Sequence, residues 1–330
     1  MKFVVIRASL AVLTLILVSF VVFTLMELVP GDCAERYVAF KNSQGSVITP
    51  EDIQIERVRL GLDQPYLQRW GSWIFNAFRG EFGDSCILRL NIGQLLGQKF
   101  WLSLGLCISA LALAYVIAIP VGIIAATSRN AALNNSLRLV SYLGLALPNF
   151  LLALMIMLFS TVMYGDSLTG LFSKEFRDAA WSWARVKDFL GHAWLPIFIL
   201  GWSATAFAIQ TVRALMSDEV GKLYVTAAAA RGVSGRRLMW RYPARHALGP
   251  IINSLGFDLN RIFNELPIVA LILTLTEAGS LLIEALARSN DQQLAGAIIF
   301  MLTASIVGLN FITDIILALT DPRVRRSILG

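Results

Sequence analysis

The sequence predicts an all-α protein that crosses a membrane several times. Of its 330 residues, 56% are hydrophobic and only 15% are charged, with a mean hydropathy of +0.66. A soluble core cannot hide that much apolar surface. A helix needs about 20 mostly apolar residues to cross a bilayer, and hydrocarbon leaves non-helical backbone groups without partners. Six stretches meet this requirement and should be membrane helices: 4–29, 100–127, 139–163, 194–215, 251–275 and 294–319.

The chain divides at the end of the first stretch. Lys2 and Arg7 precede an apolar run that is too long for a secretory signal and has no small-residue cleavage site, so 1–29 is predicted to be an uncleaved transmembrane anchor helix. Residues 30–99 combine helical apolar spacing with turn signals and are predicted to form a small periplasmic cap. Residues 100–330 then hold the five-helix core.

The basic residues predict how the helices are oriented. Segment 213–250 holds seven Lys and Arg residues against two acidic residues, whereas 30–99 holds eight of each and 165–193 four of each. Short loops rich in Lys and Arg stay in the cytoplasm. We therefore expect both termini to be cytoplasmic and 30–99 to be periplasmic, with an amphipathic helix in 165–193 at the outer headgroups. The net charge of +6 reflects this topology and does not indicate nucleic-acid binding.

The cysteines and histidines do not indicate a metal-binding or catalytic site. No C-x-x-C motif occurs, and His192 and His246 fall at opposite membrane faces, so no metal site is expected. The sequence shows no evident Ser/His or carboxylate pair that would indicate an enzyme. Cys33 and Cys86 both lie in the predicted periplasmic segment, an oxidising compartment. There they form either a disulfide or two unpaired thiols.

A short helix is predicted in the cytoplasmic loop 217–250. Its alanines favour a helix after Tyr224, and Gly232 is suited to cap the helix end. A helix faced with methyl groups allows another protein to approach closely, and the arginines that follow suit an acidic partner or anionic lipid. The loop is therefore either a docking element or a plain basic cytoplasmic loop.

Three charged residues interrupt the fifth apolar stretch. Asp258, Arg261 and Glu265 are spaced to share one helical face. Charges at that depth are costly and should face the bundle interior. They form either a ladder of ion pairs or part of the lining of a solute path, in which Asn260 and Asn264 would add hydrogen-bonding groups.

The cytoplasmic loop resembles the EAA coupling loop of ABC importer permeases. It runs from a tyrosine through an alanine-rich helix, a glycine and a basic aromatic segment to Pro250. Thr226, Ala227 and Ala228 occupy the E-A-A positions, and Gly232 occupies the glycine position. Further motifs in the same order make the chain similar to B-type permease subunits of the oligopeptide/dipeptide (peptide/nickel) ABC importer family: Val29–Asp32, Leu60–Pro65, Gly80–Ser85 and Asp321–Arg325.

This resemblance implies a non-catalytic subunit in the bacterial inner membrane, forming half of a translocation path for peptides or peptide-like solutes. The implied partners are a homologous second permease, two cytoplasmic ATPases and a periplasmic solute-binding protein. ATP and magnesium would bind the ATPases, because this chain lacks a phosphate loop and no cofactor of its own is expected. The residues expected to transmit ATPase motion are Tyr224, Thr226, Ala227, Ala228, Arg231, Gly232 and Pro250.

One segment departs from the family pattern. The region after the fifth stretch usually carries a Phe-Ser-Trp-Pro-Gly-Leu-Gly segment, of which 273–279 keeps only Gly279. This leaves a glycoside, an opine-like compound or another small polar solute as an alternative to a peptide. Nickel is disfavoured by the scarcity of histidine. A membrane scaffold or receptor subunit is a further alternative, against which the coupling loop argues.

Overall fold

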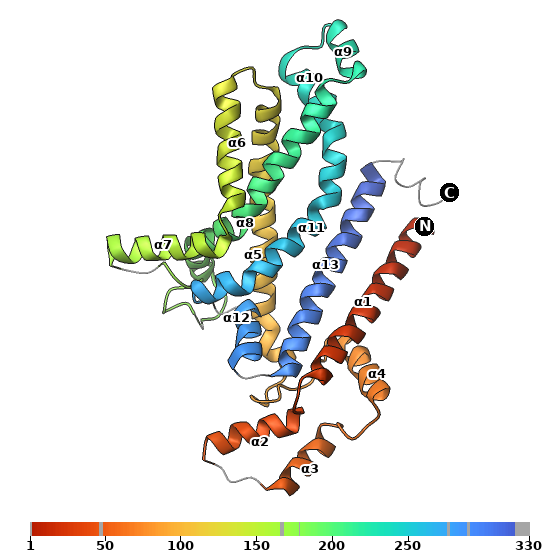
Figure 1. Ribbon diagram of the computed structural model, residues 1–330, viewed down its shortest axis with the longest axis vertical. Coiled ribbons are helices and arrows are strands. Elements are labelled where there is room, and N and C mark those ends of the chain that lie inside the picture. The colour runs from red at the N-terminus through yellow and green to blue at the C-terminus, as the bar shows by residue number, and fades with distance from the viewer. Residues whose placement is uncertain are drawn as a thin grey trace. The chain divides into compact units, whose positions relative to one another are not determined.

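The computed structural model describes residues 2–45, 49–165, 168–177, 179–275, 278–288 and 291–320. Within these ranges the chain is helical, without strands, and one isolated bridge joins Asp84 to Asn91 (Figure 1). The all-α prediction is confirmed for this part of the chain. The helices are α1 (Lys2–Leu28), α2 (Cys33–Ser43), α3 (Pro50–Arg59), α4 (Tyr66–Ala77), α5 (Ile92–Thr127), α6 (Ala131–Ala146), α7 (Asn149–Tyr164), α8 (Trp183–Val220), α9 (Leu223–Ala230), α10 (Gly235–Arg241), α11 (Pro243–Ile272), α12 (Ala278–Ile283), the π-helical turn Glu284–Arg288 and α13 (Gln292–Thr320).

Four of the described helices are long and apolar enough to cross a membrane: α1, α5, α8 and α13. The bent pair α6 and α7 would make a fifth span. Helix α11 contains the fifth predicted stretch but does not meet the same criterion, and it carries Asp258, Arg261 and Glu265. Length and composition in the described chain therefore support four or five of the six predicted spans.

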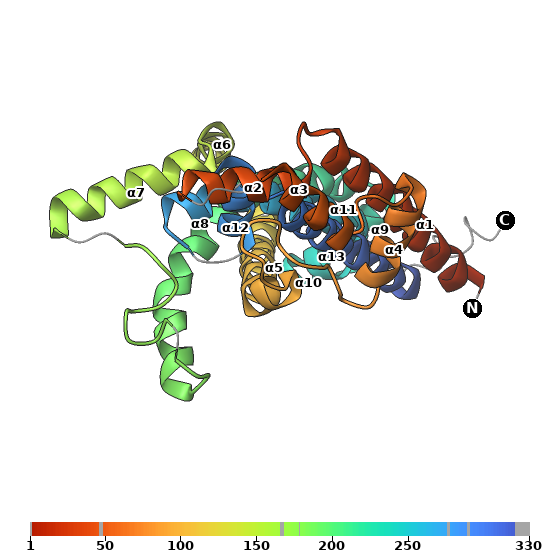
Figure 2. The same cartoon turned by 90° about the horizontal axis from the view of Figure 1, so that it is seen from below.

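The third predicted stretch, 139–163, is not one continuous helix. Helix α6 ends at Ala146 and α7 begins at Asn149, with a bend of 93° that is visible in Figures 1 and 2. Pro148 cannot donate a backbone hydrogen bond and forces Leu147 into an extended conformation (ψ 111°). The sequence predicts one span over 139–163, and the structure divides this stretch into two helices at a sharp bend.

The chain folds into two compact units. The larger unit comprises residues 1–4, 104–275 and 309–330, and the smaller comprises 5–103 and 276–308. Each is described below by itself.

Helix α8 is central to the larger unit and packs closely against its neighbours through small residues. A Cβ added to Gly144 of α6 would lie 2.7 Å from the Cβ of Ala206, and one added to Gly122 of α5 would lie 2.6 Å from the Cβ of Val212. Small residues at such crossings let helix backbones approach. Helix α8 begins at Trp183, so the predicted amphipathic helix in 165–193 is in part the start of this long helix.

A disulfide and a group of hydrogen bonds join distant segments of the smaller unit. A disulfide joins Cys33 at the start of α2 to Cys86, with the two Cα atoms 5.3 Å apart. Next to it, the buried carboxylate of Asp291 accepts hydrogen bonds from the hydroxyl of Ser85 and, at 3.3 Å, from the backbone N–H of Ile87. Asp291 also accepts at 3.0 Å from the N–H of Leu294, which caps α13. These bonds fix the 84–91 turn to the first turn of α13.

Candidate functional site: a coupling loop and a buried polar cluster

Helix α9 forms where the alanine run predicts it. Its last turn closes with Gly232 at a positive φ of +85°, where the N–H of Gly232 donates to the carbonyl of Ala229 at 2.9 Å. The N–H of Val233 donates to the carbonyl of Ala228 at 3.2 Å. This pair of bonds is the Schellman arrangement, which favours glycine at the left-handed position. The predicted helix and its glycine cap are both present.

One face of α9 packs inward. Val225 and Ala228 are buried against Leu238 of α10, and Ala228 is only 1% exposed. Ala228 therefore supports the loop from within, which sequence position alone did not reveal. Contact with another protein would fall to the opposite face, which consists of Leu223 (87% exposed), Thr226, Ala227, Ala230 and Arg231.

Tyr224 links α9 to the two long helices beside it. Its hydroxyl donates a hydrogen bond to Glu219 in the last turn of α8, and its ring centroid lies 5.1 Å from that of His246 in α11. Lys222 forms an ion pair with the same Glu219 carboxylate. Burial and the bond to Glu219 raise the pKa of Tyr224 above its ordinary value, so the phenol remains a donor. A displacement of α9 would therefore pull on both helices.

Pro250 lies further along α11 than these contacts. It is exposed within the helix, where it removes a backbone donor, while Pro243 occupies the first helical position. The structure thus places Pro250 outside the packed part of the loop. Tyr224 and Ala228 belong to that packed part, and Gly232 closes α9 beside it.

The second candidate site is a buried polar cluster between α5, α8 and α11. Asp258 is 1% exposed, and it accepts a hydrogen bond from the hydroxyl of Tyr115 on α5 and a long one, 3.4 Å, from the hydroxyl of Ser254. The Tyr115 and Ser254 hydroxyls lie 3.0 Å apart. Tyr115 is not among the predicted site residues, although a tyrosine in the middle of an apolar stretch is a usable signal.

The two carboxylates of the cluster are only partly satisfied. Glu265 accepts a long hydrogen bond, 3.4 Å, from the hydroxyl of Ser203 on α8. Its second oxygen, Oε2, and Oδ1 of Asp258 are buried without a hydrogen-bond partner in the structure. Because an unpaired buried polar atom is costly, each such atom requires an explanation, and a functional role is one of them.

Arg261 does not form the ladder of ion pairs that the sequence left as one of two alternatives. Among the described residues, no ion pair within 4.0 Å joins it to Asp258 or Glu265. Its guanidinium instead lies 5.5 Å from the ring centroid of Phe207. Asn260 is half-buried and Asn264 is exposed, and neither hydrogen-bonds to the cluster in the described part of the chain.

The fold is that of an ABC transporter permease. A solved structure of the MetNI methionine ABC transporter in inward-facing conformations matches with a TM-score of 0.55 and 16% sequence identity. The match covers 69% of this chain and 97% of that one.

The chain itself belongs to the family of binding-protein-dependent transport system inner membrane components. Residues 118–326 match this family, and residues 1–87 match its N-terminal region. A peptide transport system permease protein of Brucella abortus (strain 2308) is 27% identical over 320 residues, covering 97% of each chain. The glutathione transport system permease protein GsiC of Escherichia coli K12 is 26% identical over 312 residues, covering 94% of this chain and 95% of that protein. The resemblance inferred from the motifs is confirmed, and the protein is a membrane-embedded permease.

Proposed function

We propose that this chain is one of two homologous permease subunits in a bacterial ABC importer for peptides or peptide-like solutes. The observation that carries the proposal is its full-length similarity to permeases named for peptide and glutathione transport. The chain would contribute half of the translocation path. It would make and break no bonds and would hold no cofactor.

The proposed arrangement in the membrane has six spans, with α11 as the fifth, and both termini in the cytoplasm. Residues 1–29 would be the anchor helix, 30–99 the periplasmic cap and 100–330 the permease core. The charge asymmetry between 213–250 and 30–99 supports this orientation. A periplasmic solute-binding protein would contact the periplasmic face of the subunit. Two cytoplasmic ATPases, which hold ATP and magnesium, would contact the cytoplasmic face.

The coupling loop would transmit ATPase motion through α9. Its outward face combines the exposed Leu223 with the smaller Thr226, Ala227 and Ala230, which suits close packing in a partner's groove. Tyr224 supports this role because it ties α9 to α8 and α11. Closure of the ATPases would push α9 and, through Glu219 and His246, rock both helices between inward and outward states.

The polar cluster would form part of the solute path. Among the described residues, Asp258 and Glu265 each keep one buried oxygen without a hydrogen-bond partner, and Arg261 forms an ion pair with neither. A peptide carries donors for the two carboxylates and acceptors for the guanidinium. The alternation of negative, positive and negative groups on α11 therefore favours a zwitterionic or amide-rich solute, with Asn260 and Asn264 as neighbouring groups.

The solute class can be tested by stimulation of ATP hydrolysis. The complete transporter, reconstituted with its binding protein, would be offered short peptides, glutathione, glycosides and opine-like compounds at equal concentrations. We expect stimulation by peptides or glutathione. Stimulation by a glycoside or an opine alone would assign the alternative solute, which the unusual 273–279 segment allows. Assembly without stimulation by any solute would favour a scaffold or receptor role.

A further inference from the structure

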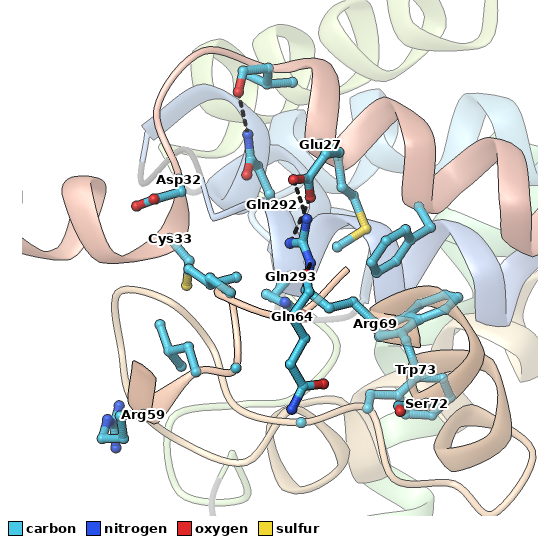
Figure 3. A pocket seen from close by; sticks show the side chains of 18 of the residues that line it. Glu27, Asp32, Cys33, Arg59, Gln64, Arg69, Ser72, Trp73, Gln292 and Gln293 are labelled. Atoms are coloured by element: carbon cyan, nitrogen blue, oxygen red, sulfur yellow. Dashed lines mark hydrogen bonds and ion pairs between the residues drawn. The ribbon is translucent and has the colours of Figure 1, made fainter. Parts of the chain in front are cut away.

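The smaller unit contains a cavity of about 740 Å³ that none of the roles above uses. We call it the cap cavity. Its wall is formed by the end of α1, the start of α2, the turn after α3, helix α4, the 81–83 turn and the start of α13 (Figure 3). Sites for small molecules commonly measure about 300 to 1,000 Å³. The cap cavity is therefore large enough for a short peptide.

The wall of the cap cavity is held in place by covalent and ionic links. The Cys33–Cys86 disulfide fixes the start of α2. Arg57 at the end of α3 binds Asp32 at 2.5 Å, and Arg69 on α4 binds both carboxylate oxygens of Glu27 on α1, at 2.5 and 3.0 Å. A wall that is already rigid loses less conformational freedom when a ligand binds.

Most charged groups of the wall are neutralised within the protein. Besides the Arg69–Glu27 and Arg57–Asp32 pairs, Arg59 binds Glu56 at 2.7 Å. Glu81 is exposed and has no side-chain partner among the described residues. The cavity thus offers a ligand one unpaired negative group and little other net charge.

The remaining polar groups of the wall are uncharged and available. Gln64, Ser72, Asn76 and Gln293 make no side-chain hydrogen bond in the part of the chain that the structure describes. Three of the four are carboxamides, each with donors and an acceptor, which is also the pattern of a peptide group. They come from three different segments of the wall, and Figure 3 shows Gln64 and Gln293 near the Arg69–Glu27 pair.

Apolar surface alternates with these polar groups. Phe23, Trp73 and Phe82 contribute aromatic rings to the wall. On α4 the lining residues recur at helical spacing, so that Arg69, Ser72, Trp73 and Asn76 share the face toward the cavity. Gln68, on the same helix, is exposed and does not line the cavity.

We propose that the cap cavity binds a short peptide. The carboxamides of Gln64, Asn76 and Gln293 pair with its backbone, Glu81 accepts its amino terminus, and the aromatic rings take its side chains. The choice of a peptide as the ligand rests on the proposed function. If the transporter imports peptides, a peptide is the solute that reaches the cap in the periplasm. The site would hold solute on the periplasmic side.

The test uses the assembled transporter in nanodiscs, without ATP and without the binding protein. The probe is a tripeptide of two alanines and one photoreactive benzoylphenylalanine. We expect its cross-links to map to cap-cavity residues and unlabelled trialanine to compete. The double variant Ser72→Leu, Asn76→Leu removes two hydrogen-bonding groups and should weaken binding about tenfold. Gln68→Leu, a change at an exposed position of α4 that does not line the cavity, should leave binding unchanged.

Several outcomes would overturn the proposal. Cross-links that map only outside the cavity would do so. Equal peptide affinity in the double variant and in the wild-type protein would also do so. ATP-driven peptide uptake is measured in parallel. Uptake without peptide at the cap cavity overturns only this inference, whereas peptide at the cap cavity without uptake contradicts only the proposed function.

Discussion

The hydroxyl of Tyr115 donates a hydrogen bond to the buried carboxylate of Asp258 and thereby joins α5 to α11. Only one other donor, the Ser254 hydroxyl at 3.4 Å, reaches that carboxylate in the described structure. The Tyr115 bond is therefore the main internal compensation for a carboxylate held in an apolar helix bundle.

Tyr115→Phe is expected to destabilise the larger unit. The change keeps the ring but removes the donor to Asp258, at a cost of about 1–3 kcal/mol for a polar group left unsatisfied. Thermal unfolding in detergent, followed by fluorescence, measures the loss. Tyr142→Phe is the matched control, because Tyr142 of α6 is 52% exposed and should tolerate the change. Equal unfolding temperatures for both variants would show that the bond contributes nothing.

Glu265→Gln should separate stability from transport. The neutral amide lowers the cost of a buried, unpartnered oxygen, so the unfolding temperature should stay the same or rise. If Glu265 meets the solute, uptake should fall about tenfold, as expected for loss of a charge-assisted hydrogen bond, while basal ATP hydrolysis persists. Glu175→Gln, at an exposed loop position, serves as the control. Full uptake by Glu265→Gln would remove this residue from the path.

Gly232→Val is expected to uncouple ATP hydrolysis from transport. At φ +85° a β-branched residue is strained by about 1–2 kcal/mol, although a Cβ there would meet no atom within 4 Å. The defect would therefore come only from backbone strain at the C-terminal cap of α9. Gly221→Val is the control, since Gly221 also has open space around it but a φ of −77°. The measurement is solute-stimulated ATPase activity, and the account fails if both variants respond equally.

The disulfide should stabilise the cap. Mass spectrometry of non-reduced peptides is expected to find Cys33 linked to Cys86, with Cys107 outside the link. Replacing both linked cysteines with serine should cost about 2–4 kcal/mol and make the 30–99 segment more sensitive to protease. Wild-type protein treated with reductant should behave like the variant. Alkylation of both thiols in the unreduced protein would contradict the structure.

Local patterns in the sequence predicted local structure well. The alanine run and Gly232 indicated α9 and its cap because helix propensity and a left-handed glycine act within a few residues. Pro148 interrupts the helix between α6 and α7, but a proline alone does not predict a bend of 93°. That corner also depends on Asn149, whose side chain donates to the carbonyl of Leu200 and accepts from the N–H of Ser203, both at 3.2 Å.

Contacts between distant segments could not be predicted. The inward packing of Ala228 depends on Leu238 across a tight turn, and the Tyr115–Asp258 bond spans 143 positions of sequence. The cap cavity is assembled from five separate segments, so no single motif indicates it. The Asp321–Arg325 motif lies outside the described residues and remains a feature of the sequence alone.

The most direct test of the account is peptide uptake into proteoliposomes. They would contain this chain, its partner permease, the two ATPases and the binding protein. The account predicts that a labelled tripeptide accumulates inside the vesicles only when ATP and magnesium are supplied on the ATPase side. ATP hydrolysis without accumulation of tripeptide, or accumulation that needs no ATP, would contradict it.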